Sequence, residues 1–184
     1  MAHYIGIDIG GTTISIGLVD SAGSLLEETI LPTRAEEGVV QALQRIEKII
    51  GETIDSQGHN FDLKAIGLGV PGILDKEQCS IVESSNLKNW VGHNIAGELS
   101  KHFGVPVSMG NDADMAAMGE FWQGAGQGAD SFLMVTLGSG IGGAIITKGQ
   151  PLCLAQGSLE LGHTIVNFNG AACLCGKKGV PRPT

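Results

Sequence analysis

The chain has 184 residues, which fits one ordinary domain or two small lobes. Apolar residues make up 42% of it and charged residues 16%, so a solvated, disordered chain is excluded. The formal net charge of -8 repels phosphate backbones and anionic lipids, and no apolar run reaches the roughly 18 residues of a membrane span, so we expect no nucleic-acid and no membrane partner.

The N-terminus predicts a cytoplasmic protein with reduced cysteines. Met1-Ala2-His3-Tyr4 leads directly into an apolar strand pattern, without the basic start, apolar stretch or cleavage site of a signal peptide. The chain has 4 cysteines, and the spacing of Cys173-x-Cys175 is poor for an ordinary disulfide.

Three meandering strands are predicted to begin the fold. Runs of β-branched residues separated by small turn residues place these strands over 4–10, 14–20 and 25–31. Apolar residues then recur three and four positions apart over 36–54, which is typical of one face of a helix. We expect this helix to cover the sheet.

Strands and helices alternate in the next stretch. A short strand is expected over 65–70, ended by Pro71-Gly72, and a helix over 95–103, ended by a glycine. A strand is then expected over 105–109. A further helix is predicted over 112–122, where small residues permit close packing.

The pattern restarts after a glycine-rich linker. A strand over 131–137, a glycine turn over 138–143 and a strand over 144–147 repeat the order seen at the start of the chain. This weak internal symmetry predicts two lobes that face a cleft, the first formed by residues 1–123. Residues 124–184 begin the second lobe, which we expect to be incomplete.

The sequence Gly6-Ile7-Asp8-Ile9-Gly10-Gly11-Thr12-Thr13 places a carboxylate in a strand before a turn of small residues. Consecutive backbone N–H groups in such a turn form an anion-binding hollow without any lysine, which suits a nucleotide site in an acidic protein. Asp8 would hold Mg²⁺ there, directly or through water. The alternative is a simple hairpin turn in which Asp8 caps exposed amides.

The second glycine turn, Gly138-Ser139-Gly140-Ile141-Gly142-Gly143, fits the G-x-G-x-x-G pattern of dinucleotide-binding folds. Such folds need a helix after the glycines, with its N-terminus on the pyrophosphate. Residues 144–149 are instead typical of a strand and a turn, so we do not expect a dinucleotide site. Gly67-x-Gly69-x-x-Gly72 fits the same pattern, which shows how readily a chain with 29 glycines produces it.

Six motifs follow one another in a specific order. They are Asp8-Ile9-Gly10-Gly11-Thr12, Gly69-Val70-Pro71-Gly72, Asn111-Asp112-Ala113, Leu137-Gly138-Ser139-Gly140-Ile141-Gly142-Gly143, Glu160-Leu161-Gly162-His163 and Cys173-x-Cys175-Gly176. In this order the chain resembles the ROK family of sugar kinases and repressors, over residues 4 to about 179. The resemblance implies an α/β fold of the actin-like ATPase (ribonuclease H-like) type, with sugar and ATP in the cleft between two lobes.

The resemblance implies that both glycine turns bind the phosphates of ATP. The implied ATP-binding residues are Asp8, Gly10, Gly11, Thr12, Thr13, Gly138, Ser139, Gly140, Gly142 and Gly143. Three positions depart from the family pattern: Thr13 stands where lysine is usual, Ser139 where threonine is common and Ala144 where glycine is common.

Asn111-Asp112 follows a strand and opens a helix, and taken alone this pair favours a helix N-cap. The resemblance implies instead that Asp112 is the catalytic base, which accepts the sugar hydroxyl proton as that oxygen attacks the γ-phosphoryl group. The implied sugar-binding residues are Asn86, Asn111, Asp112, Glu160 and His163. Amides and carboxylates suit this role because each hydroxyl needs an acceptor and often a donor.

The resemblance also implies a structural Zn²⁺ bound by His163, Cys173 and Cys175, because the family uses one histidine and three cysteines. Val180 stands where the third cysteine belongs. We therefore expect an incomplete zinc site, in which Cys153 or water substitutes for the missing ligand.

The family pattern is lost after Gly179. Arg182 stands where a sugar-binding glutamate belongs, and the sequence runs only to Thr184. We expect a frameshift, a wrongly assigned splice or a truncation at this point.

As a whole, the resemblance implies an ATP-dependent, glucokinase-like sugar kinase that uses ATP and Mg²⁺. Its substrate would be glucose or an N-acetylhexosamine, phosphorylated at the primary hydroxyl, and the full-length protein would be a homo-oligomer. Two alternatives stay open. One is a sugar-sensing repressor of the same family, which the start of the phosphate motif at Gly6 and the acidic charge both disfavour. The other is an inactive or regulatory fragment.

Overall fold

The computed structural model divides into two compact units, Met1–Asp112 and Ala113–Thr184. The structure describes residues 2–58, 61–75, 80–84, 86–137, 141–152, 159, 161–173 and 176–181. The predicted division of the whole protein into two lobes after residue 123 stays a prediction.

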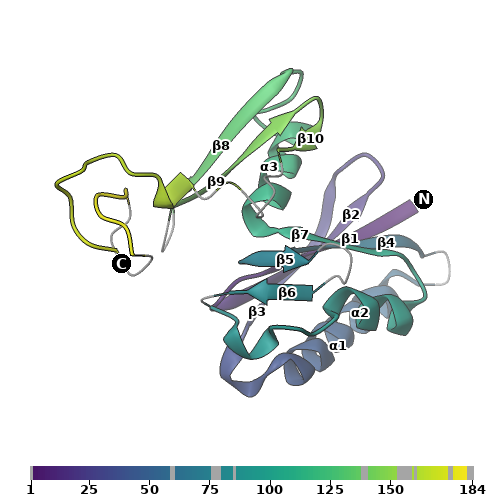
Figure 1. Ribbon diagram of the computed structural model, residues 1–184. Coiled ribbons are helices and arrows are strands. Elements are labelled where there is room, and N and C mark those ends of the chain that lie inside the picture. Colours follow the sequence, from purple (N-terminus) through teal and green to yellow (C-terminus); the bar gives the residue numbers. More distant parts are fainter. Residues whose placement is uncertain are drawn as a thin grey trace. The chain divides into compact units, whose positions relative to one another are not determined.

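A five-stranded sheet forms the centre of the first unit (Figure 1). The strands follow one another in space as β3 (Leu25–Pro32), β2 (Thr13–Asp20), β1 (Ala2–Ile9), β4 (Asp62–Val70) and β7 (Val107–Asn111). β1, β2 and β3 pair antiparallel, whereas β4 and β7 run parallel to β1. The predicted strands are confirmed, and β7 begins two residues later than expected because Pro106 has no N–H to donate to the ladder.

The two predicted helices of the first unit are present, one of them with an interruption. α1 (Val39–Gln57) begins later than the apolar spacing predicts, because Gly38 has a φ of 91° and separates it from the 3-10 turn η1 (Ala35–Glu37). α2 (Ile95–Phe103) has the predicted bounds, and the side chain of Asn94 caps its N-terminus. Within the described ranges, no helix is both long and apolar enough to cross a membrane.

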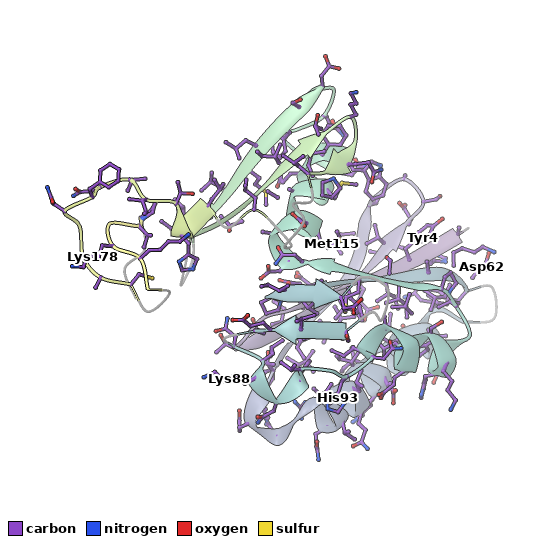
Figure 2. The ribbon with its side chains drawn as sticks, in the orientation of Figure 1. Tyr4, Asp62, Lys88, His93, Met115 and Lys178 are labelled. Carbon is purple, nitrogen blue, oxygen red and sulfur yellow. The ribbon has the colours of Figure 1, made fainter. Side chains whose placement is uncertain are left out.

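One face of the sheet packs against both helices and forms the core of the first unit. On β1, Ile5, Ile7 and Ile9 are buried and alternate with exposed residues. They pack with the apolar faces of α1 and α2, which lie on the same side of the sheet in Figure 1. Tyr4, labelled in Figure 2, lies on the opposite face of β1. The predicted covering of the sheet by the first helix is therefore confirmed.

A short hairpin that the sequence pattern does not predict follows β4. β5 (Ile73–Asp75) pairs antiparallel with β6 (Ser80–Glu83), and the 3-10 turn η2 (Lys88–Trp90) follows. Gly72 makes the entry to the hairpin possible, because its φ is 117° and a Cβ there would clash with the carbonyl oxygen of Glu83. Strands of 3 and 4 residues are too short to give a clear alternation in the sequence.

The second unit combines one helix with a small antiparallel sheet. The sheet has three strands, in the spatial order β10 (Gln150–Pro151), β9 (Ile141–Thr147) and β8 (Ser131–Leu137). α3 (Asp112–Gln123) begins at the last residue of the first unit. Its Ala117 is fully buried in a small cluster with Ala144 and Ile146 of β9. Ala117 is thus one of the small residues of this helix that permit close packing, as the sequence predicts.

The strand β9 begins at Ile141, three residues earlier than the sequence predicts. Gly142 and Gly143 therefore lie in the ladder with β8 rather than in a turn. Glycine is needed there because a Cβ at Gly143 would lie 2.7 Å from the carbonyl oxygen of Met134. The remaining residues of the predicted turn, 138–140, lie outside the described ranges.

The packing of α1 can be tested at Ile46, which has 0% exposure. Ile46→Ala removes buried carbon atoms and leaves a cavity, so we expect the free energy of unfolding to fall by about 2–5 kcal/mol. Lys48→Ala is the matched control on the exposed side of α1, where an ion pair with Glu52 contributes little, and we expect a change below about 0.5 kcal/mol. Urea denaturation followed by circular dichroism measures both; equal losses would contradict the described packing.

Candidate functional site

Three predicted site residues of the first unit lie at the carboxyl ends of β1 and β7, with β4 between these strands: Asp8, Asn111 and Asp112. The strands run parallel, and their register places Asp8 beside Gly69 and Gly69 beside Gly110. Asn111 ends β7 and Asp112 begins α3, which is the order of strand and helix that the sequence predicts. Residues far apart in the sequence therefore meet at one edge of the sheet.

The carboxyl groups of Asp8 and Asp112 interact electrostatically. Asp8 is one of the exposed residues of β1, but neighbouring atoms remove part of the water around its carboxyl group. This desolvation raises the pKa of Asp8 above its ordinary value, and the negative charge of Asp112 raises this pKa further. A cation near the pair would relieve the repulsion. Mg²⁺ prefers oxygen ligands and takes few carboxylates from the protein, so the donor chemistry of this pair fits the predicted magnesium.

The first glycine turn is exposed on one side and hydrogen-bonded on the other. Gly11, Thr12 and Thr13 are exposed, and the N–H of Gly10 donates to the carbonyl oxygen of Thr13 over 2.8 Å. Thr33 is fully buried. Its hydroxyl donates to the carbonyl oxygen of Gly10 over 2.7 Å, and its N–H donates to that of Thr12 over 2.9 Å. Carbonyls held inward are compatible with the predicted anion-binding hollow.

Asn86 lies against the first glycine turn on a short, anchored loop. The hydroxyl oxygen of Ser84 accepts a 3.2 Å hydrogen bond from the N–H of Leu87, and both Leu87 and Trp90 are fully buried. Asn86 itself is exposed, and a Cβ added at Gly11 would lie 3.0 Å from the Cβ of Asn86. The structure thus brings a predicted sugar-binding residue beside the predicted phosphate turn.

Asn111 connects the edge of the sheet with the β5–β6 hairpin. Its Nδ2 donates a 3.3 Å hydrogen bond to the carbonyl oxygen of Gly72, the residue at the entry to the hairpin. This bond gives the side-chain amide a fixed direction at the edge where Asp8 and Asp112 lie. Asn111, a predicted sugar-binding residue, therefore lies next to Asp112, the predicted base, and at the same edge of the sheet.

The predicted residues of the second unit are described only in part. Gly142 and Gly143 lie in β9, and His163 is the last residue of the 3-10 turn η3 (Leu161–His163). The Nδ1 atom of His163 lies 3.7 Å from the Sγ atom of Cys173. The predicted site residues outside the described ranges are Gly138, Ser139, Gly140, Glu160 and Cys175, and Cys153, the expected substitute ligand of the zinc, lies outside them too.

The donor set of the predicted zinc site is half in place. His163 and Cys173 supply one imidazole nitrogen and one thiol, two of the four donors of a structural zinc site. Val180, at the position of the missing cysteine, is 5% exposed and offers only an apolar side chain. Among the described residues, no group of three or more histidine, cysteine, aspartate and glutamate side chains could hold a metal ion. The described donors alone therefore do not make a zinc site.

Two buried hydroxyl residues support the site without belonging to a motif. Thr33 bonds to the first glycine turn, and Ser84 bonds within the loop that carries Asn86. Both are buried polar residues. Their sequence signal is weak, because threonine and serine are common at strand ends and in turns that have no function.

Comparisons with known sequences match almost the whole chain to one family. A family model described as the ROK family matches residues 4–180. The glucokinase of Thermotoga maritima is 39% identical over 176 residues, which cover 95% of this chain and 54% of that protein. A xylose repressor of Caldicellulosiruptor bescii is 30% identical over 181 residues, which cover 97% of this chain and 45% of that protein. The chain spans about half the length of the curated relatives that it matches.

Two solved structures share the fold. A ROK hexokinase from Thermus thermophilus has a TM-score of 0.81 and 33% identity, and the match covers 97% of this chain and 58% of that one. A ROK family glucokinase from Streptomyces griseus, solved in complex with glucose and AMPPNP, has a TM-score of 0.80 and 34% identity, with 97% and 55% covered. The predicted α/β fold of the actin-like ATPase type is thereby confirmed.

Asp8→Asn tests the electrostatics of this sheet edge. Because the pKa of Asp8 is raised on folding, the unfolded chain ionises this carboxyl more readily, and the carboxylate destabilises the fold at neutral pH. We expect Asp8→Asn to raise the unfolding temperature at pH 7. The gain should disappear as the pH falls through the raised pKa and below the ordinary value of 3.8. There the Asp8 carboxyl of the parent chain is protonated in both the folded and the unfolded state.

Glu28→Gln is the matched control, since it removes an exposed carboxylate from β3. Its effect shows how much of a gain comes from removing any negative charge from this acidic chain. Thermal unfolding followed by circular dichroism between about pH 3 and pH 8 compares the two variants with the parent chain. A gain from Asp8→Asn that stays constant across this range would contradict the assigned electrostatics.

Proposed function

This chain belongs to the ROK family, and on that premise we propose that it phosphorylates the primary hydroxyl of a hexose, glucose or an N-acetylhexosamine, with ATP as the phosphoryl donor. The observation that carries the proposal is the gathering of Asp8, Asp112, Asn86 and the exposed turn 10–13 within one compact unit. The similarity to a glucokinase supports this substrate class. Since the chain spans about half of that relative, the activity of the whole protein is part of the proposal.

Asp112 is the proposed catalytic base. Its carboxylate accepts the proton of the sugar hydroxyl while the hydroxyl oxygen forms a bond to the γ-phosphorus of ATP. The bond from the γ-phosphorus to the bridging oxygen breaks, and ADP leaves with the electron pair. Asp112 suits this role because the first residue of a helix at a sheet edge is held more firmly than a residue in a mobile loop.

The triphosphate needs favourable contacts that overcome the net charge of -8. We propose that Asp8 holds Mg²⁺, directly or through water, and that the bound ion neutralises phosphate charge. The N–H groups of the exposed residues Gly11, Thr12 and Thr13 would bind phosphate oxygens. The proposed residues of the second phosphate-binding segment are Gly138, Ser139, Gly140, Gly142 and Gly143.

Side-chain amides are the proposed partners of the sugar hydroxyls in the first unit. Asn86 precedes Leu87, whose N–H is bonded to Ser84, and the side-chain amide of Asn111 is bonded to Gly72. Asp112 adds a carboxylate. Glu160 and His163 are proposed to complete the set. A site with such partners discriminates against sugars that lack a hydroxyl, because its polar groups would be left unpaired.

For the second unit we propose weak zinc binding by His163, Cys173 and Cys175, since Val180 provides no fourth donor. We expect the purified chain to hold less than one zinc ion per molecule and Cys173→Ser to hold still less. Metal analysis by mass spectrometry measures both. A zinc content unaffected by Cys173→Ser would contradict this set of ligands.

A sugar-sensing protein without phosphoryl transfer is the second candidate. The observation that favours it is the similarity to a xylose repressor over 97% of this chain. Such a protein would bind the sugar through the same amides and carboxylates. It would release no ADP, so turnover separates the two candidates.

Asp112→Asn is the direct test of the proposed chemistry. The amide keeps the shape of the carboxylate but accepts no proton, so we expect ADP release to fall by at least about 100-fold. Sugar affinity, measured by calorimetry, is expected to change by less than about threefold, because the hydrogen-bonding positions remain. The assay offers glucose, mannose, N-acetylglucosamine and N-acetylmannosamine to the 184-residue chain.

The matched control is Asp55→Asn, an exposed carboxylate on α1, which is expected to alter neither quantity. Equal turnover by Asp112→Asn and the parent chain would refute the role of Asp112. Sugar binding without turnover by the parent chain would favour the second candidate. Neither binding nor turnover with any of the four sugars would overturn both functions.

Gly11→Ala tests the contact between the sugar side and the phosphate side. The added Cβ would lie 3.0 Å from Cβ and 3.2 Å from Cγ of Asn86, so the loop must shift. We expect the dissociation constants of glucose and MgATP to rise together, by about 3- to 10-fold. Gly51→Ala in α1, where a Cβ has open space, is the control. A rise for only one ligand would contradict the described contact.

A further inference from the structure

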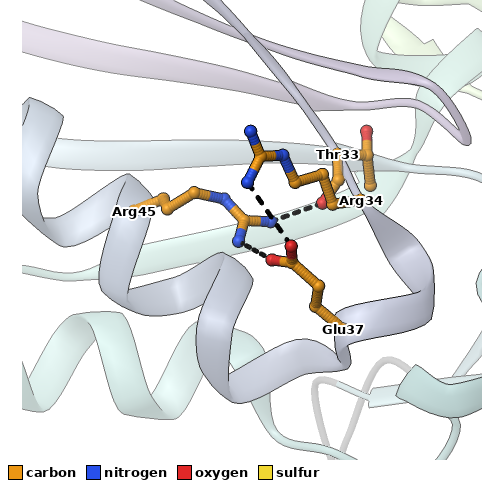
Figure 3. A network of polar contacts seen from close by, with 4 residues as sticks. All are labelled: Thr33, Arg34, Glu37 and Arg45. Atoms are coloured by element: carbon orange, nitrogen blue, oxygen red, sulfur yellow. Dashed lines mark hydrogen bonds and ion pairs between the residues drawn. The ribbon is translucent and has the colours of Figure 1, made fainter.

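Thr33, which bonds to the first glycine turn, belongs to a network of polar contacts with Arg34, Glu37 and Arg45 (Figure 3). The Nη2 atom of Arg45 donates a 2.6 Å hydrogen bond to the carbonyl oxygen of Thr33. The Nη1 atom of Arg45 contacts Oε2 of Glu37 at 2.5 Å, and Nη1 of Arg34 contacts Oε1 of Glu37 at 3.4 Å. Thr33, the buried member of this network, is the residue that bonds to the turn.

The hydrogen bonds that Thr33 makes to two carbonyl oxygens of the turn also set the direction of the N–H groups in the same peptides. The C=O and N–H of a trans peptide point in opposite directions, and no cis peptide occurs among the described residues. Thr33 holds the carbonyl oxygens of Gly10 and Thr12 on its own, buried side. The N–H groups of Gly11 and Thr13 therefore point away from Thr33, and both residues are exposed. An anion would need N–H groups in that direction.

The hydroxyl bond of Thr33 is separate from the pairing of the sheet. The bond from its N–H to Thr12 continues the β2–β3 ladder, in which Thr13 lies opposite Pro32. The bond from Oγ1 to the carbonyl oxygen of Gly10 leaves this ladder and reaches the β1 side of the turn. Loss of the hydroxyl would therefore release one peptide of the turn and leave the strand pairing in place.

Arg45 connects Thr33 with the helix α1, which packs in the core of the unit. It belongs to α1, whose Ala42 and Ile46 are fully buried against the sheet. The Arg45 side chain is only 25% exposed, so solvent weakens its contact with Glu37 less than that of a surface pair. The position of the turn thus depends on the packing of a helix that carries none of the predicted site residues.

We propose that Thr33 and Arg45 are positioning residues for the phosphates of ATP, which they serve by fixing the N–H groups of Gly11 and Thr13 without touching the nucleotide. The inference rests on the proposed function and deepens it, because it assigns nucleotide affinity to residues outside the motifs. Sugar affinity depends on them little, since Leu87, the residue after Asn86, is held by its own hydrogen bond to Ser84.

Calorimetric titration of the 184-residue chain with MgATP and, separately, with glucose tests the inference. Thr33→Val removes the hydroxyl and keeps the shape and the N–H. We expect the dissociation constant of MgATP to rise by about 5- to 10-fold and that of glucose to change by less than about twofold. Thr33→Ser restores the donor and is expected to bind MgATP like the parent chain. Thr53→Val, at a buried threonine of α1, is the control and is expected to leave both unchanged.

MgATP binding by Thr33→Val as tight as that of the parent chain overturns the inference and leaves the proposed function standing. Equal weakening of MgATP and glucose also overturns it, because a general loss of structure would then be the cause. A parent chain that binds no MgATP overturns the proposed function and the inference with it.

Arg45→Lys keeps the test decisive should Thr33→Val fail to fold. Lysine cannot contact Thr33 and Glu37 at once with the planar geometry of arginine. We expect the dissociation constant of MgATP to rise by about 2- to 4-fold, with glucose affinity retained. Unchanged MgATP affinity in a folded Arg45→Lys chain overturns the role of Arg45.

Discussion

The parallel ladder that joins β1, β4 and β7 is the constraint on which the candidate site depends. Register within this ladder places Asp8, Gly69 and Gly110 in one row across three strands. The two glycines have no side chain to separate Asp8 from Asp112, which begins the helix after β7. Loss of hydration is the larger cause of the raised pKa of Asp8, and the repulsion by Asp112, which adds to it, follows from this arrangement. A slip of one residue would turn Asp8 to the helix-covered face and remove the carboxylate from the edge.

Glycines with the same appearance in the sequence have different physical roles in the structure. Gly11 allows the loop of Asn86 to approach the first turn, and Gly72 accommodates a left-handed backbone at the entry to a hairpin. Gly143 lies inside a strand, where the carbonyl oxygen of Met134 leaves no room for a side chain. A motif of spaced glycines therefore predicts close approach, but the partner that approaches is specified only by the fold.

The sequence predicts those parts of the fold whose position is set by residues close together along the chain. The bounds of α2 follow from the apolar spacing and the cap at Asn94, and the position of Asp112 follows from the order of strand and helix. The β5–β6 hairpin escapes such reasoning because its strands are very short. Thr33 escapes it too, because its hydroxyl acts on a residue 23 positions away along the chain, a relation that only strand pairing creates.

In the proposed phosphate site, the turn Gly10-Gly11-Thr12-Thr13 has no lysine, so the orientation of its N–H groups would matter more than charge. The attraction of an ammonium group for a phosphate does not depend on its rotation, whereas an N–H dipole attracts an anion only while it points at it. A turn that offers only backbone N–H groups would therefore lose affinity for an anion when its peptides rotate. In an acidic chain with no compensating cation in the turn, the buried hydroxyl of Thr33 restrains the first of these peptides, and α1 restrains Thr33 through Arg45.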